Sequence, residues 1–376
     1  MENQSITING NQYSFKDGDT ILSVAESNGI HIPTLCYLKD TTPTGACRIC
    51  LVELEGINEL AASCATPAVD GMVVHTDSQK VIEARRFNIE LLLASGDHNC
   101  LAGTADVSSW TDFQLNALES AEHGDICPSY GDCRLQVLAI EYRVKNVRFD
   151  IEKSKFPTEA VNPLIIRDFS RCISCGRCVQ ACNELVVNRV LKMEKIDGRT
   201  KVVTKGDLPY NESDCVFCGQ CVEVCPVGAL TEKKSTGFAP ASNIKKVRTT
   251  CPYCGVGCQV WLHMDGDKIK KVTAVENGAP NKGRLCVKGR FGYDFIYSNE
   301  RLRTPLIKEK DGFREASWDE ALDLVADKFK EIIEKHGPDA LAGVSCARSI
   351  NEDSYQMQKL FRAVFGTNSI DHCART

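Results

Sequence analysis

Alternating apolar and polar residues in the first 78 positions predict a small sheet that packs on one helix. Asn9-Gly10, a dipeptide typical of two-residue hairpin turns, separates two alternating runs. Asp19-Thr20 provides capping side chains for an apolar helix, and Gly29 provides its stop signal. The predicted elements are strands at 6–8 and 12–15, a helix over 21–28 and a closing strand at 72–75. This order is typical of a β-grasp-like unit.

Helical spacing of apolar residues dominates two later parts of the chain. It predicts a helix over 79–95, and two more near 109–121 and 133–143 in a loop-rich region. A second series begins with the capping box Ser317-Trp-Asp-Glu320. It predicts a helix to about residue 335, a strand at 340–345, a helix over 351–365 and a strand at 369–372. A buried strand normally continues into a covering element, so we expect this α/β layer to be incomplete.

Composition narrows the possible functions. A chain of 376 residues with 43% hydrophobic and 25% charged residues is long enough for two or three ordinary globular domains. A net charge of −5 argues against a nucleic-acid partner. The sequence has no secretory signal and no apolar run of about 18 residues, so we expect a cytoplasmic protein without a membrane span. The 21 cysteines stand in tight groups, which in a reducing compartment indicates metal binding or redox chemistry.

Two cysteine runs repeat at an interval of about forty residues between residues 162 and 232. Both have the C-x2-C-x2-C-x3-C spacing of two-cluster bacterial ferredoxins, and Pro226 follows the second. Three ligands come from one loop and the fourth comes from the other repeat. One [4Fe–4S] cluster is therefore expected on Cys172, Cys175, Cys178 and Cys225, and another on Cys182, Cys215, Cys218 and Cys221. Gly176 and Gly219 would let the two loops turn tightly. Two structural zinc sites are the alternative.

Three further groups surround this repeat. Cys36-x10-Cys47-x2-Cys50-x13-Cys64 follows the β-grasp pattern and predicts a [2Fe–2S] site, with structural zinc as the alternative. Cys100, Cys127 and Cys133 with His98 predict a [4Fe–4S] cluster in which one imidazole replaces a thiolate. His123 is the alternative histidine ligand, and either histidine could simply be a surface residue.

A fourth arrangement, Cys251-x2-Cys254-x3-Cys258-x27-Cys286, suits another [4Fe–4S] cluster. Lys288 lies two residues after its last ligand, where it is either a functional group or a plain surface charge. Cys346 and Cys373 have no partners in this pattern, and we expect both to be buried structural thiols.

Together, CPYCGVGC with LCVKGR, and NPLIIRDFSRCISCGRCVQACNE, give the chain a family resemblance. Over essentially all 376 residues it resembles the N-terminal part of a molybdenum- or tungsten-dependent formate dehydrogenase catalytic subunit. One departure is the separation of Cys100 from Cys127 by residues 101–126, because relatives usually space these two ligands three positions apart. The resemblance implies that Lys288 contacts the pterin cofactor and takes part in electron transfer.

The resemblance also implies an α+β multi-domain fold. Its parts would be a [2Fe–2S] β-grasp domain at 1–78, a histidine-ligated [4Fe–4S] domain at 79–150, a two-[4Fe–4S] ferredoxin domain at 151–235, the [4Fe–4S] module of molybdopterin oxidoreductases at 245–300 and an incomplete α/β pterin-binding domain at 301–376. In the family, a segment like NSIDHCART leads into the metal-binding cysteine or selenocysteine. We therefore expect the catalytic metal ligand directly after Thr376. Our explanation for the end of the sequence at this point is a selenocysteine codon, which is otherwise read as a stop codon. A cloned fragment and a stand-alone electron carrier are alternatives.

The implied reaction is reversible formate oxidation to CO2 at a bis(molybdopterin guanine dinucleotide) centre. Electrons would pass from the cluster on Cys251 through the two ferredoxin-type clusters. They would then reach the histidine-ligated cluster and the [2Fe–2S] cluster, and finally a flavin-bearing NAD(P)-reducing subunit or a ferredoxin. Three alternative hypotheses are that the chain resembles the large subunit of NADH:quinone oxidoreductase, that it is an [FeFe]-hydrogenase-related electron-transfer subunit, or that it is a stand-alone iron-sulfur electron carrier.

Overall fold

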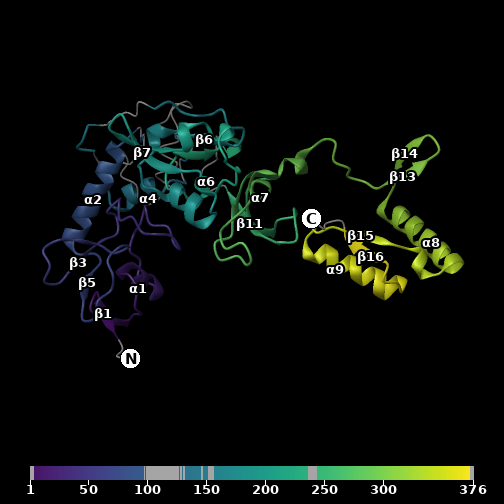
Figure 1. Ribbon diagram of the computed structural model, residues 1–376, viewed down its shortest axis with the longest axis horizontal. Coiled ribbons are helices and arrows are strands. Elements are labelled where there is room, and N and C mark those ends of the chain that lie inside the picture. Colours follow the sequence, from purple (N-terminus) through teal and green to yellow (C-terminus); the bar gives the residue numbers. More distant parts are fainter. Residues whose placement is uncertain are drawn as a thin grey trace. The chain divides into compact units, whose positions relative to one another are not determined.

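The computed structural model describes residues 4–96, 98, 127, 129, 132–144, 147–150, 156–235 and 244–372. The predicted helix at 109–121 and the side chains of Cys100, His123 and Cys373 lie outside these residues. The chain forms two units (Figure 1). One contains residues 1–245 with 264–271, and the other contains residues 246–263 with 272–376.

A five-stranded mixed sheet with one helix opens the first unit. Its strand order is β2-β1-β5-β3-β4, with β1 parallel to β5 and the other neighbours antiparallel. The bounds are β1 (Ser5–Ile8), β2 (Asn11–Ser14), α1 (Ile21–Ser27), β3 (Leu51–Leu54), β4 (Ala61–Ala62) and β5 (Val73–His75). The Thr20 side chain caps α1 by accepting a hydrogen bond from the Ser23 backbone N–H. The predicted hairpin, cap and closing strand are thus confirmed.

Two helices connect this sheet to the cysteine repeat. They are α2 (Gln79–Ala94) and α4 (Arg134–Glu141), close to their predicted bounds. Ile89 and Leu93 of α2 pack in one apolar core with Leu35 of the N-terminal sheet domain and Val227 of the repeat. Segments of all three domains predicted before residue 235 therefore contribute to one core.

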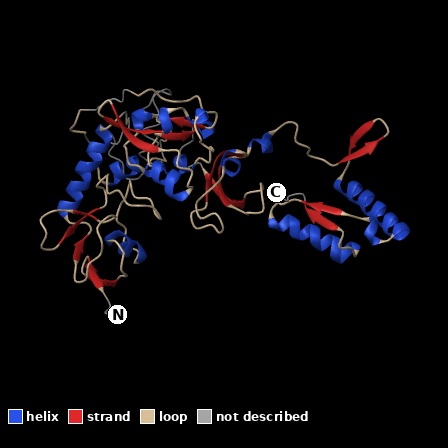
Figure 2. Ribbon diagram, in the orientation of Figure 1, coloured by secondary structure: helices blue, strands red, loops and turns tan. Residues whose placement is uncertain are grey.

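The repeat itself is built from short elements around two cysteine loops (Figure 2). They are β6 (Ile165–Arg167), η1 (Phe169–Arg171), α5 (Arg177–Gln180), η2 (Ala181–Leu185), β7 (Lys192–Ile196), β8 (Arg199–Val203), η3 (Lys205–Asp207), η4 (Tyr210–Glu212), α6 (Gln220–Val224), β9 (Leu230–Glu232) and η5 (Lys233–Ser235). β6 pairs with β9 and β7 with β8, both antiparallel. The β6–β9 pair ties the start of the first half to the end of the second.

The chain from residue 245 onward begins with a sheet that the cysteine pattern does not predict. Its strands are β10 (Lys245–Thr250), β11 (Gln259–Asp265) and β12 (Lys268–Ala274), followed by α7 (Val287–Phe291) and η7 (Asp294–Tyr297). Then come β13 (Leu306–Glu309), β14 (Gly312–Glu315), α8 (Trp318–His336), η8 (Pro338–Ala340), β15 (Gly343–Ser345), α9 (Asn351–Lys359), η9 (Leu360–Phe365) and β16 (Ile370–His372). β15 and β16 pair in parallel. The strand predicted from residue 340 starts later, because 338–340 form a helical turn.

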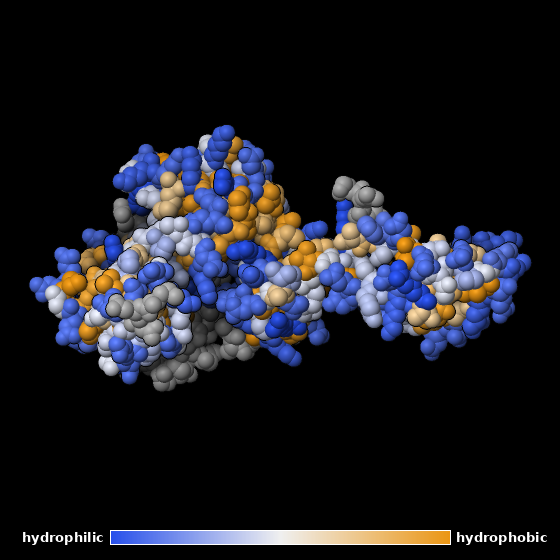
Figure 3. Space-filling view, turned by 60° about the horizontal axis from the view of Figure 1, so that its bottom comes forward, coloured by the Kyte–Doolittle hydropathy of each residue, from blue (hydrophilic) through white to orange (hydrophobic). Residues whose placement is uncertain are grey.

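The described residues include no helix long and apolar enough to cross a membrane. On the face drawn in Figure 3, hydrophilic residues cover most of the surface and apolar residues form scattered patches.

Candidate metal centres

Five groups of metal-binding side chains follow from the sequence, and each is named after its first member. They are the Cys36 set (Cys36, Cys47, Cys50, Cys64), the His98 set (His98, Cys100, Cys127, Cys133), the Cys172 set (Cys172, Cys175, Cys178, Cys225), the Cys182 set (Cys182, Cys215, Cys218, Cys221) and the Cys251 set (Cys251, Cys254, Cys258, Cys286). Apart from Cys100, the structure places every member.

The Cys36 set is brought together by the long loop between α1 and β3 and by the segment after β4. All four of its cysteines are buried. The backbone N–H of Cys36 donates to the Cys47 sulfur at 3.4 Å, and the N–H of Cys47 donates back to the Cys36 sulfur at 3.5 Å. A hydrogen bond from the Cys47 thiol lowers the pKa of Cys36 to about 5, and one from the Cys64 thiol lowers the pKa of Cys50 to about 6. The same hydrogen bonds raise the pKa of the donating thiols, Cys47 and Cys64, so the loop favours the thiolate, the form that binds iron, at one cysteine of each pair.

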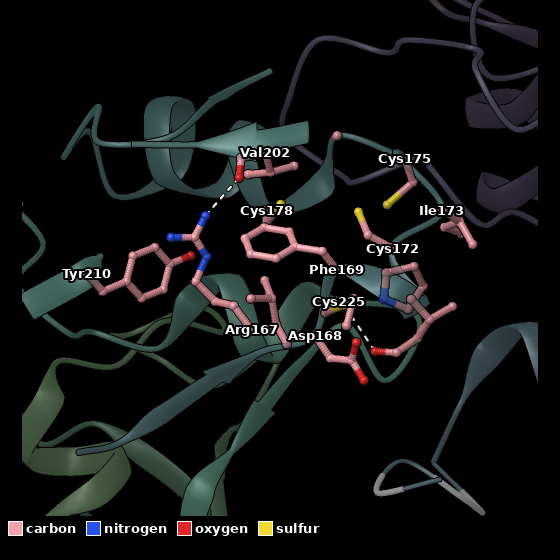
Figure 4. A pocket seen from close by; sticks show the side chains of 15 residues that line it. Arg167, Asp168, Phe169, Cys172, Ile173, Cys175, Cys178, Val202, Tyr210 and Cys225 are labelled. Atoms are coloured by element: carbon pink, nitrogen blue, oxygen red, sulfur yellow. Dashed lines mark hydrogen bonds between the residues drawn. The ribbon is translucent and has the colours of Figure 1, made fainter. Parts of the chain in front are cut away.

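All members of the Cys172 set line one cavity, together with apolar side chains such as Phe169 and Ile173 (Figure 4). Cys172 and Cys175 come from the loop between η1 and α5, Cys178 lies in the first turn of α5, and Cys225 directly follows α6. Gly176 has φ of 77°, a left-handed conformation that lets this loop turn before α5 begins. The structure therefore brings the four cysteines that the sequence groups across the two repeats together around one cavity.

The Cys182 set lines a second cavity of the same construction, with Val190 and Leu191 among its apolar neighbours. Gly219, at φ of 71°, provides the corresponding turn before α6. Tyr210 lines both cavities, and its hydroxyl donates to the Cys221 sulfur at 3.9 Å. Tyr210 thus lies between the two sets.

Burial in these cavities opposes thiolate formation. It raises the pKa of Cys175 and Cys221 to about 12 and that of Cys225 to about 11. Without a metal, four neutral thiols would be buried among apolar side chains with few hydrogen-bond partners. Bound iron would instead balance the negative charge of four thiolates, so that they could remain buried. The donor sets therefore fit iron-sulfur clusters, although no three side chains of the described residues enclose a single metal ion.

A buried arginine lies beside both cavities. Arg167 is 2% exposed, and its guanidinium lies 4.8 Å from the Phe169 ring centre and 4.4 Å from that of Tyr210. It forms an ion pair with Glu159 at 3.1 Å and donates to the Val202 carbonyl at 2.8 Å (Figure 4). Sequence patterns do not reveal this residue, because a charged side chain is ordinarily expected at the surface.

The described members of the His98 set lie close to the Cys172 set. Cys133 is buried in the core that includes Val227. A Cβ on Gly228 would lie 3.1 Å from the Cys127 sulfur, and one on Gly96 would lie 3.7 Å from the His98 Nε2 atom. Gly228 thus leaves room for the Cys127 side chain, whereas at Gly96 the close neighbour is the Ser170 carbonyl oxygen, 2.1 Å from such a Cβ, and the distance to His98 is an ordinary contact.

The Cys251 set differs in its exposure to solvent. Cys251 is buried, Cys254 and Cys258 are half-buried, and Cys286 is exposed. Burial raises the pKa of Cys251, and the nearby Lys288 cation opposes this shift. The Lys288 amine lies 5.9 Å from the centre of the Tyr253 ring. This lysine is thus close to Cys251 and Tyr253.

Among the leftover thiols, Cys346 is half-buried rather than buried, so that prediction is wrong. It lies just after β15, and the short β15–β16 pair does not cover it completely.

Comparison with protein families identifies four matching segments in this order. Residues 2–79 match a 2Fe-2S iron-sulfur cluster binding domain, and residues 171–229 match a 4Fe-4S dicluster domain. Residues 244–298 match the molybdopterin oxidoreductase Fe4S4 domain, and residues 301–376 match the molybdopterin oxidoreductase domain. Four successive segments of the chain are thus similar to domains that bind iron-sulfur clusters or occur in molybdopterin oxidoreductases.

Similar curated proteins come from two bacteria. "Probable oxidoreductase YjgC" of Bacillus subtilis is 33% identical over 99% of this chain. "Putative formate dehydrogenase" of Staphylococcus aureus strain USA300 is 31% identical over 100% of it. The chain spans 39% of the length of each of these relatives.

A solved structure shares part of the fold. It is a chain of an NAD+-reducing [NiFe]-hydrogenase in the H2-reduced state, with a TM-score of 0.53 and 27% sequence identity. The similarity covers 63% of this chain and 90% of that one.

Proposed function

We propose that this chain is the electron-transferring N-terminal part of a formate dehydrogenase. The proposal rests on the order of the four domain matches along the chain. The same chain also aligns over its whole length with a protein named as a putative formate dehydrogenase. The reaction would convert formate to CO2, one proton and two electrons, and would be reversible.

Five clusters would be held by the five sets, with one [2Fe–2S] on the Cys36 set and a [4Fe–4S] on each of the others. When bound, such clusters accept and release single electrons. The protein's own part would be to bring four sulfur atoms together and to keep water away from them, and the apolar residues that line the cavities of the Cys172 and Cys182 sets suit this role. His98 would supply the one imidazole ligand.

The pterin-bound molybdenum or tungsten would supply the two-electron chemistry. Lys288 would contact this cofactor, since its amine already lies beside the Cys251 set and Tyr253.

The partner we propose is a flavin-bearing subunit that reduces NAD(P), or else a ferredoxin. The likeness to a chain of an NAD+-reducing hydrogenase favours the first choice. An electron-transfer subunit that works without pterin is the second candidate, because that same likeness covers 63% of the chain.

Cluster content is the first test. Anaerobically purified chain should contain about 18 irons and matching acid-labile sulfide, the sum of one two-iron and four four-iron clusters. Zinc in their place would refute the cluster assignment. For the activity, the longest natural product of the gene should contain molybdenum or tungsten and reduce a dye with formate. Iron-loaded protein that transfers electrons but contains neither molybdenum nor tungsten would favour the second candidate.

A further inference from the structure

The loop of the Cys36 set is held against the helix that follows the Cys172 loop. Arg177 is the first residue of α5 and stands between Cys175 and Cys178. Its guanidinium donates to the carbonyl of Tyr37, the residue directly after Cys36. Its Nε also donates to the Val224 carbonyl at 2.7 Å. One side chain thus links ligand-bearing segments of two proposed clusters.

Two more residues on the same helical face make this contact. Gln180 donates to the Thr42 carbonyl, and Glu184 accepts from both the backbone N–H and the hydroxyl of Thr42, at 2.8 and 3.0 Å. Residues 177, 180 and 184 follow the i, i+3, i+7 spacing of one face. The contact is therefore a continuous face of α5 and η2 against the loop between Cys36 and Cys47.

Arg177 differs from its two neighbours on this face because it carries a buried positive charge. It is 6% exposed, and in the part of the chain that the structure describes it has no ion pair with a carboxylate. Burial and the neighbouring Arg134 cation lower its pKa, and the sulfur groups of Cys175, Cys225 and Cys36, which belong to two different sets, oppose this shift. A charge in such a low-dielectric position acts more strongly on its neighbours than a solvated one does.

We propose that Arg177 is a positioning residue that holds the Cys36 loop against the Cys172 loop and raises the reduction potentials of both clusters. This inference rests on the proposed function, since it assumes that the two sets hold clusters. A reduced cluster carries one more negative charge than an oxidised one, and a fixed cation nearby stabilises the reduced form. Because Arg177 acts on both sets, both potentials rise together.

The test is a redox titration of the full chain with all its clusters, followed by electron paramagnetic resonance. In Arg177→Met, the reduced-to-oxidised ratio of the Cys36 and Cys172 clusters at a fixed solution potential should fall about tenfold, or about 59 mV for a one-electron couple. In Arg177→Lys, which keeps the charge, the ratio should stay within about threefold of the native value. The Cys251 cluster should not shift in either variant.

Two control variants separate charge from structure. Gln180→Met removes a neutral hydrogen bond of the same face, and Lys192→Met removes an exposed cation of the same region. Both should leave the two potentials unchanged. Unchanged potentials in Arg177→Met would overturn the proposal, as would an equal fall in Arg177→Lys or in Gln180→Met. If Arg177→Met does not retain iron, Arg177→Gln takes its place. Native protein without clusters would instead refute the proposed function.

Discussion

Apolar side chains differ in their exposure to solvent between two regions of the molecule. These regions are the cysteine repeat, residues 156–235, and the C-terminal region, residues 301–372. In the repeat, Ile165 is fully buried and Tyr210 is 1% exposed. In the C-terminal region, Leu322 is 58% exposed, and no residue of the 19-residue α8 is buried. An apolar helical stripe forms a core only when another layer faces it. The repeat closes such a core around its thiols, whereas the described part of the C-terminal region does not.

The same contrast holds for charges. Arg167 pairs with Glu159 inside the repeat, where the two side chains are 2% and 16% exposed. Arg314 pairs with Glu309 and Glu320 at the surface, where all three side chains are more than 40% exposed. The first pair has lost its hydration and the second has kept most of it. Similar contacts should therefore differ in their contribution to stability.

Removal of iron should give the largest difference between the two regions. A chelator under reducing conditions should cause the amides of α5, β7 and β8 to lose protection from hydrogen exchange by about a hundredfold or more, because metal binding and folding are coupled in small metal domains. Exchange in α8 should stay within about twofold. Mass spectrometry of exchanged peptides would measure both, and an equal response in α8 would contradict the contrast.

Replacing an arginine in each region should give the next largest difference. Arg167→Met leaves the Glu159 carboxylate without its partner, so local unfolding of the repeat should become easier by about 3–5 kcal/mol. Arg314→Met should cost about 0–1 kcal/mol. Hydrogen exchange on the iron-loaded protein gives both values. The double variant Glu159→Gln with Arg167→Met should recover part of the stability that Arg167→Met loses. If it recovers none, the unpaired charge of the Glu159 carboxylate is not the cause of the loss.

Truncating one apolar side chain in each region tests the packing directly. Ile165→Ala should destabilise the repeat by about 2–5 kcal/mol through lost burial and a cavity. Leu322→Ala, on the exposed face of α8, should change the stability by no more than about 0.5 kcal/mol. A large loss for Leu322→Ala would mean that α8 is covered in solution by another part of the protein.

Much of the secondary structure could be predicted from the sequence, because its signals are local. The Asn9-Gly10 turn, the Thr20 cap and the Ser317 cap each act within four residues, and the structure confirms all three. Strand β10, Lys245–Thr250, could not be predicted in this way. Five of its six residues are exposed, so it has no apolar alternation to recognise.

The candidate centres show a similar division. Cysteine spacing predicts which thiols meet, because each loop delivers its ligands at fixed intervals. The residues that set the charge around them could not be found in this way. Arg167 and Arg177 are separated in sequence from Glu159 and Tyr37, and only the fold shows that both arginines are buried.

The smallest predicted effect concerns the helix caps. Ser317→Ala removes the side chain that accepts from the Glu320 N–H at 3.1 Å, which should cost about 1 kcal/mol. Thr20→Ala removes a similar cap from α1, whose Ile21 and Leu22 are buried in the N-terminal core.

The two losses should spread differently although they are similar in size. Because α8 buries no residue, the loss at Ser317 should raise hydrogen exchange only in the first turn of that helix. The loss at Thr20 should raise exchange in β1 and β5 as well, since α1 shares their core. Faster exchange in β15 and β16 after Ser317→Ala would show that residues 301–372 unfold as one cooperative unit. The cysteine repeat and the C-terminal region would then differ in the exposure of their side chains but not in the cooperativity of their unfolding.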